Sequence, residues 1–118
     1  MPQTGEKEHT WAENSGDVKY HLGTHYTREY PDGKKMTIEV LANPSHLECI
    51  NPVAMGKARA EQHYSGETGA HSKRNKIIPI LVHGDASFSG QGVVFESLQM
   101  QDLKNYSVGG TIHVIVNN

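Results

Sequence analysis

The residues best suited to metal chemistry are Asp85 and Asn118, because each closely follows an apolar, strand-like run. A carboxylate and a side-chain amide oxygen are hard ligands suited to Mg²⁺, which keeps its remaining octahedral positions for water and phosphate oxygens. The stretch between the two runs is long enough for one helix and a connecting loop. If the two strands are parallel, both side chains can lie at one edge of the sheet and form a metal-bridged diphosphate site.

The same residues also have a purely structural interpretation. Gly84-Asp85 could cap the helix that follows, and Asn117-Asn118 could form a turn, with no metal involved. Spacing by itself leaves both interpretations open.

Two strands and one helix must position this pair. The unbroken apolar run at residues 77–82 predicts a strand covered on both faces, and residues 111–116 predict a second strand. The intervening stretch predicts a helix that starts near Asp85, whose N-terminus would favour an anion at the same edge. A strand, helix and strand of this length favour a parallel pair with a right-handed crossover. The buried stripe expected on this helix consists of Val94, Phe95 and Leu98.

Other elements are predicted before this unit. Alternation at residues 36–41, after the turn signal Pro31-Asp32-Gly33, predicts a strand. Ser45 and Glu48 have the spacing of a capping box, and Asn51-Pro52 offers a second N-cap for a helix over about residues 52–63. The polar residues 1–14 are interpreted as a loosely ordered lead-in to one domain at residues 15–118.

Composition excludes several classes of function. The chain has 118 residues, with 11 basic and 13 acidic side chains scattered along it, which gives no electrostatic footprint for nucleic acid. Apolar runs long enough for a membrane span, and a secretory signal, are not found in the sequence. The single cysteine, Cys49, cannot form an internal disulfide and is interpreted as a packing residue.

Four sequence blocks carry a family resemblance: Gly-Asp-Val-Lys-Tyr-His-Leu-Gly at 16–23, Ala-Asn-Pro-Ser-His-Leu-Glu at 42–48, His-Gly-Asp-Ala-Ser-Phe-Ser-Gly-Gln-Gly-Val-Val at 83–94, and Gly-Gly-Thr-Ile-His-Val-Ile-Val-Asn-Asn at 109–118. In this order they closely resemble the thiamine-diphosphate-dependent decarboxylating component of the 2-oxoglutarate dehydrogenase complex. The resemblance implies an α/β fold, part of a thiamine-diphosphate-binding fold with a mainly parallel sheet and a crossover helix.

The resemblance also implies a set of site residues. Asp85 and Asn118 would hold Mg²⁺, while Asp85, Ala86 and Ser87 would line the diphosphate of thiamine diphosphate. The Mg²⁺ assignment agrees with the spacing argument. Positions matching the family's cofactor segment are Ser45, His46 and Leu47, and positions matching those that face the 2-oxo acid are His21 and Ser45.

The chemistry of a 2-oxo dicarboxylate explains the need for such side chains. It carries two negative charges and a carbonyl that accepts carbanion attack, so imidazoles and a hydroxyl are useful donors beside it. His21 and His46 are therefore the predicted catalytic residues. Considered without the resemblance, His21 could be a packed strand residue, Ser45 an N-cap and His46 a surface residue. The histidines interpreted as structural or solvated are His9, His63, His71, His83 and His113.

The resemblance implies a function and partners for a longer protein. We expect oxidative decarboxylation of 2-oxoglutarate, with succinyl transfer to the lipoyl group of an acyltransferase, in the mitochondrial matrix. A homodimer partner subunit would complete the active site. Two alternatives remain, namely the related 2-oxoadipate component and a catalytically silent fragment that binds at subunit interfaces. We expect a partial chain, inactive alone, whose strands expose apolar surface.

Overall fold

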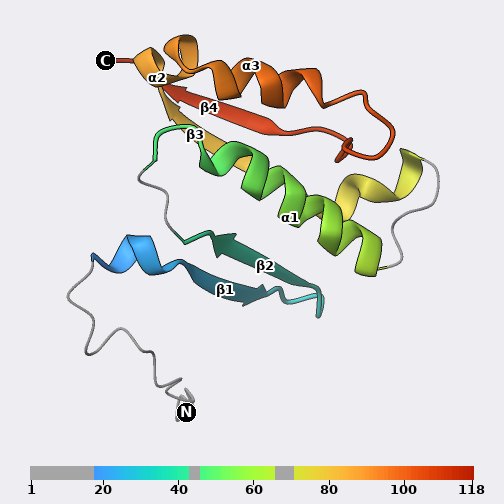
Figure 1. The fold of residues 1–118 in the computed structure, drawn as a ribbon. Helices are drawn as coiled ribbons and strands as arrows, with labels where there is room; N and C mark the ends of the chain where they lie inside the picture. Colours follow the sequence, from blue (N-terminus) through green and yellow to red (C-terminus); the bar gives the residue numbers. More distant parts are fainter. Residues whose placement is uncertain (1–17, 43–45, 66–70) are drawn as a thin grey trace. The chain divides into compact units, whose positions relative to one another are not determined.

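The computed structural model describes residues 18–42, 46–65 and 71–118 (Figure 1). It divides into two compact units, Met1–Asn43 and Pro44–Asn118. Among the described residues, none of the helices has the length and apolar character needed to cross a membrane. The elements in chain order are η2 (Lys19–Leu22), β1 (Thr24–Glu29), β2 (Lys35–Val40), α1 (Ile50–Tyr64), η3 (His71–Lys76), β3 (Ile80–Gly84), α2 (Asp85–Gly90), α3 (Gly92–Gln99) and β4 (Ile112–Val116).

The first unit contains an antiparallel hairpin of β1 and β2. Its turn is closed by the Gly33 amide, which donates to the carbonyl of Tyr30 at 2.9 Å, and Gly33 has a φ of 80°. The strand predicted at residues 36–41 is confirmed, one residue earlier. Its partner β1 was not predicted, although a turn signal between two β-prone runs is typical of a hairpin.

Gly23 joins η2, which contains His21, to β1. It has a φ of 73°, and a Cβ at this position would lie 2.8 Å from the carbonyl oxygen of Val40. An L side chain would therefore be strained and would collide with the backbone of β2. Glycine at this position lets the short helix end directly against the hairpin.

One face of the hairpin is apolar and exposed. Tyr26 pairs with Ile38 in the antiparallel register, and Met36 and Val40 lie on the same face of β2. All four side chains are exposed. Neither strand of this unit therefore has a buried face of its own.

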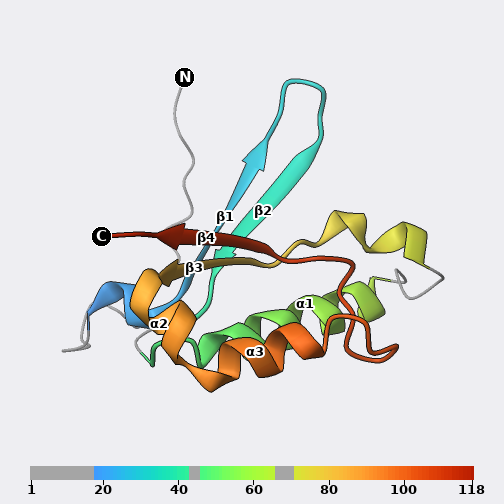
Figure 2. The ribbon, with the colours of Figure 1, turned by 90° about the horizontal axis from the view of Figure 1, so that it is seen from above.

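The second unit is built on a parallel pair, β3 and β4, in which Gly84 lies opposite Val116. This confirms the predicted strand–helix–strand unit with parallel strands. The expected mainly parallel sheet is found only in this pair, since the hairpin is antiparallel. Helices α1 and α3 lie on one side of the two strands (Figure 2).

Only one face of β3 is covered, which corrects the prediction of a strand buried on both faces. Leu81 and His83 are buried, whereas Ile80 and Val82 are exposed, Val82 by 70%. The strand also begins later than predicted. Pro79 has no amide hydrogen for a ladder, and its carbonyl instead accepts from the Ile112 amide at 3.0 Å. The expected exposure of apolar strand surface is confirmed.

The helix predicted after Asp85 is two helices, α2 and α3. They are separated at Gln91, whose backbone is extended, with a φ of −93° and a ψ of 122°. The predicted stripe is also partly wrong. Val94 is 2% exposed, but Phe95 is 55% exposed and Leu98 is not buried; Ser97 occupies the second buried position.

The amide of Gln62 connects three segments of the second unit. Its side chain, on α1, is fully buried, and Nε2 donates to the carbonyls of Val108 at 2.8 Å and Ile77 at 3.0 Å. A longer contact of 3.3 Å reaches the carbonyl of Arg74. The amide thus satisfies backbone acceptors on both segments that lead into the parallel strands.

Replacing this amide should destabilise the fold. Gln62→Leu leaves the buried carbonyls of Ile77 and Val108 without their donor, while removing Oε1, which has no partner. We expect the free energy of unfolding to fall by about 1 to 2 kcal/mol, measured by urea denaturation with circular dichroism. Gln99→Leu, at an exposed position of α3, is the matched control. An equal loss in both variants would contradict the role of Gln62.

Candidate functional site

The predicted metal pair lies at the carboxyl edge of the parallel strands. Asp85 is the first residue of α2, directly after β3, and Asn118 follows β4 by two residues. Figure 1 shows α2 and the C-terminus together at the tips of the two strand arrows. The parallel direction that the metal site requires is therefore present. Coordination by these two side chains stays a prediction.

The other predicted site residues have different surroundings. Ala86 is exposed and Ser87 half-buried in the first turn of α2, whereas His46 and Leu47 are exposed just before α1. Ser45 lies outside the described residues. His21 is half-buried in η2 of the first unit.

A buried carboxylate that was not predicted as a site residue lies beside this edge. Glu48 is 5% exposed, and its Oε1 accepts from the Ser87 hydroxyl at 2.7 Å. Its Oε2 accepts from Asn51 Nδ2 at 2.7 Å and contacts His83 Nδ1 at 2.6 Å. The carboxylate thus connects the segment before α1, the end of β3 and the first turn of α2.

These contacts correct the predicted caps of α1. The Glu48 side chain bonds to Asn51, Ser87 and His83, and the backbone of Glu48 has a φ of 69°; its predicted capping-box partner Ser45 lies outside the described residues. The helix begins at Ile50 with Cys49 as its N-cap, so Asn51 lies inside the helix and is not a cap. Cys49 is exposed, which corrects its interpretation as a packing residue.

Two histidine rings extend the hydrogen-bonded cluster of Glu48, Asn51 and Ser87 into the sheet. His83 Nε2 lies 2.9 Å from His113 Nδ1, and the rings stack with centroids 5.1 Å apart. Phe88 of α2 packs edge-on against His83, with a centroid distance of 4.8 Å. His83 and His113 are structural residues as predicted, but they also link β4 to Glu48. A polar residue on the inward face of an apolar strand needs a buried partner, and that signal could have found this link.

The hydrogen bonds determine the charge state of the cluster. Burial raises the pKa of Glu48, but donation from Asn51, Ser87 and His83 outweighs burial and leaves the pKa below its ordinary value. Burial lowers the pKa of His113, and the neighbouring His83 lowers it further. An ionised Glu48 beside a neutral His113 is therefore the favoured state at neutral pH.

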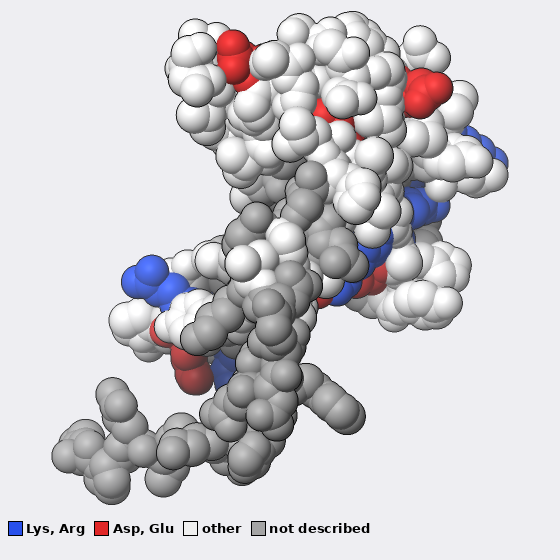
Figure 3. All heavy atoms as spheres, turned by 60° about the vertical axis from the view of Figure 1, so that its left-hand side comes forward, with Lys and Arg blue, Asp and Glu red and all other residues white. Residues whose placement is uncertain are grey.

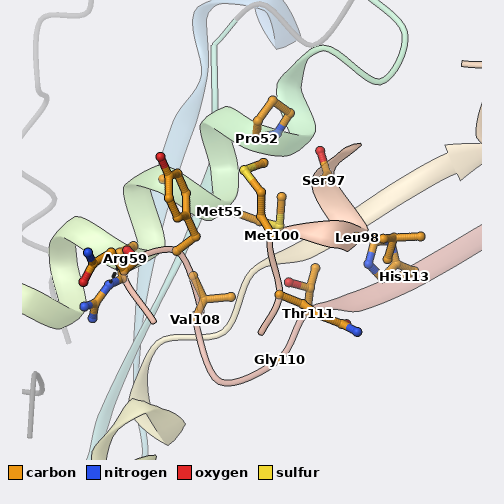
Figure 4. A pocket seen from close by; sticks show the side chains of 14 residues that line it. Pro52, Met55, Arg59, Ser97, Leu98, Met100, Val108, Gly110, Thr111 and His113 are labelled. Atoms are coloured by element: carbon orange, nitrogen blue, oxygen red, sulfur yellow. Dashed lines mark hydrogen bonds between the residues drawn. The ribbon is translucent and has the colours of Figure 1, made fainter. Parts of the chain in front are cut away.

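A separate apolar pocket lies on the other side of His113. Its volume is about 340 Å³, and it is enclosed by α1, the end of α3 and the segment leading to β4. Figure 4 shows Met55, Met100 and Val108 facing it, with His113 reaching it from β4. Its lining does not include Asp85 or Asn118. The pocket and the candidate metal edge are thus different places, connected through the histidine pair.

Surface charge is distributed in small groups. On the face that Figure 3 shows, small groups of acidic and basic side chains of the described residues, some of them side by side, lie within a mostly uncharged surface. This distribution, together with a formal net charge of −2, gives no basic band for a nucleic-acid backbone on that face.

A mixed α/β fold with oxygen ligands at the carboxyl edge of parallel strands is typical of an enzyme domain that binds a phosphorylated cofactor. Residues 2–118 match the family model described as dehydrogenase E1 component. The chain therefore belongs to the dehydrogenase E1 component family.

Curated relatives agree with this family. The chain is 54% identical over 104 residues to the mitochondrial 2-oxoglutarate dehydrogenase of Dictyostelium discoideum, covering 88% of the chain and 10% of that protein. It is 50% identical over 106 residues to the mitochondrial enzyme of Schizosaccharomyces pombe, covering 90% and 10%. The Brucella ovis 2-oxoglutarate dehydrogenase E1 component is 54% identical over 112 residues, covering 91% and 11%. The chain thus spans about a tenth of the length of these relatives.

The charge on Glu48 should make stability depend on pH. Because its pKa is lowered in the folded state, its stabilising effect is complete above the ordinary value of about 4.3 and is lost as pH falls through the folded-state pKa. We expect Glu48→Gln to lower the free energy of unfolding by about 3 kcal/mol at pH 7. The difference between the two free energies of unfolding should narrow as the pH falls below the ordinary pKa and through the lowered pKa of Glu48.

Urea denaturation at several pH values measures this difference. Glu61→Gln is the matched control, since Glu61 is exposed on α1 and its carboxylate lies 3.7 Å from Lys57. A gap between Glu48→Gln and the unmodified chain that does not change with pH would contradict an ionised, hydrogen-bonded Glu48.

Proposed function

We propose that this chain forms part of the diphosphate-binding domain of a thiamine-diphosphate-dependent 2-oxoglutarate dehydrogenase. The protein would decarboxylate 2-oxoglutarate oxidatively and transfer the succinyl group to the lipoyl group of its acyltransferase partner. The observation that carries this proposal is the identity of at least 50% to three 2-oxoglutarate dehydrogenases, over about nine-tenths of the chain. The parallel strands that end beside Asp85 and Asn118 support it.

The proposed Mg²⁺ ligands are Asp85 and Asn118. A carboxylate and an amide oxygen at the ends of adjacent parallel strands are a donor set that fits Mg²⁺ and leaves positions for diphosphate oxygens and water. When bound, thiamine diphosphate supplies the carbanion and the electron sink for decarboxylation. The residues of this chain would hold and orient it.

The structure refines how Ala86 and Ser87 would contact the diphosphate. The Ser87 hydroxyl donates within the chain, to Glu48 Oε1 at 2.7 Å or to the carbonyl of Gly84 at 3.0 Å, so its proton is not available to a phosphate oxygen. We therefore assign the contribution of both residues to their backbone amides, which precede the first hydrogen bond within α2. Since α2 has six residues, its dipole contributes less than the longer predicted helix would.

Roles for the remaining residues follow from their chemistry. His21 and His46 would donate hydrogen bonds to the substrate or to its developing charge, and Ser45 would contact the substrate. Ser45, His46 and Leu47 would also contact the cofactor. A homodimer partner subunit would complete the site, and the mitochondrial names of the eukaryotic relatives favour the mitochondrial matrix.

Calorimetry separates this proposal from its alternatives. Thiamine diphosphate and Mg²⁺ are titrated into this chain and into a chimera, in which residues 15–118 replace the matching segment of the Dictyostelium enzyme. Absence of binding in both would refute the cofactor site. Binding without release of carbon dioxide from 2-oxoglutarate would favour a silent binding role, whereas faster turnover of 2-oxoadipate would favour the related dehydrogenase.

The chimera also separates retention of the cofactor from turnover. We expect Asp85→Ala to abolish Mg²⁺-dependent retention of thiamine diphosphate, because it removes the charged metal ligand. His21→Ala should retain the cofactor and lower kcat by about 10² to 10⁴, the range for a lost general acid or base. The measurements are calorimetry and carbon dioxide release, and equal cofactor loss in both variants would contradict this division of roles.

A further inference from the structure

We propose that Glu48 is a positioning residue for the diphosphate edge, acting through the hydroxyl of Ser87 and held in place by His83. This inference rests on the proposed function. It assigns a role to two buried residues, Glu48 and His83, that the sequence patterns had marked only as a helix cap and a structural histidine.

The carboxylate connects the two segments that are proposed to contact the cofactor. Glu48 directly follows His46 and Leu47, and its Oε1 accepts from Ser87 at 2.7 Å, two residues beyond Asp85. The first turn of α2 and the segment before α1 are thus joined by one side chain. A loss of this bond releases both segments from their shared position.

The backbone of Glu48 has an unfavourable conformation, which the surrounding structure must maintain. A φ of 69° lies in the left-handed region, which non-glycine residues adopt at a cost. Three hydrogen bonds to the buried carboxylate, donated by Asn51, His83 and Ser87, hold the side chain of the residue that has this backbone conformation.

His83 supplies the third of these bonds and couples the carboxylate to β4. Its Nδ1 faces Glu48 Oε2 at 2.6 Å, so Nδ1 carries the hydrogen and Nε2 is left for His113 at 2.9 Å. An asparagine at position 83 can place its Nδ2 near the position of Nδ1, which preserves the bond to Glu48 and removes the bond to His113.

The test uses the chimera with the Dictyostelium enzyme and measures the apparent Kd of Mg²⁺ and of thiamine diphosphate by calorimetry. Glu48→Met should raise both by about 10-fold to 100-fold, the range for a lost partner behind a metal ligand. Ser87→Ala should raise them by a similar factor, and the double variant should bind no more weakly than Glu48→Met alone, because either change removes the bond between Glu48 and Ser87. His83→Asn should bind within about threefold of the unmodified chimera.

Each result separates this inference from the proposed function. An unmodified chimera that fails to bind the cofactor refutes the proposed function. Binding by that chimera, with Glu48→Met equal to a Glu61→Met control, overturns the positioning role. Additive effects of Glu48→Met and Ser87→Ala would also overturn it, and this comparison does not require Glu48→Met to fold as stably as the parent.

Discussion

The stability of the second unit depends on the free-energy cost of removing one carboxylate, that of Glu48, from water. A buried ionised group costs several kcal/mol unless donors surround it, and Glu48 has three of them, on α1, β3 and α2. These donors can meet only when the segment before α1 lies against the carboxyl end of β3. Packing at the carboxyl edge of the parallel strands and ionisation of Glu48 therefore depend on each other. The packing brings the three donors together, and the buried charge needs all of them.

The same condition limits the chemistry of the edge. Because the Ser87 hydroxyl donates within the chain, it cannot donate to a phosphate oxygen, while Asp85 and Asn118 stay the proposed ligands for an ion. The hydrogen bond of Ser87 keeps the first turn of α2 in a fixed orientation. This favours binding of a diphosphate through the backbone amides of that turn instead of through the Ser87 hydroxyl. The hydrogen bonds of Glu48 thus make the edge rigid, while Asp85 and Asn118 at the end of the sheet are the proposed ligands.

Local patterns were sufficient for some elements of this fold. Apolar runs predicted β3 and β4, and good helix formers predicted α1, each within a few residues. Glu48 was beyond such reasoning, because its partner Ser87 is 39 residues away, and a capping pattern describes only neighbours. Phe95 was misassigned for a different reason: the buried side of α3 contains Val94 and the polar Ser97, so a stripe drawn from apolar residues alone was placed too far toward Phe95.

The exposed face of the parallel pair sets a limit on how firmly the edge is held. Ile80, Val82 and Val114 all face away from the covering helices and are exposed. A two-stranded sheet with one open apolar face gains little from burial and is marginal in water. Any fluctuation of β3 against β4 moves Asp85 relative to Asn118. The affinity of the proposed metal site would therefore depend on burial of this face, because covering it would hold Asp85 and Asn118 together without any change in these proposed ligands.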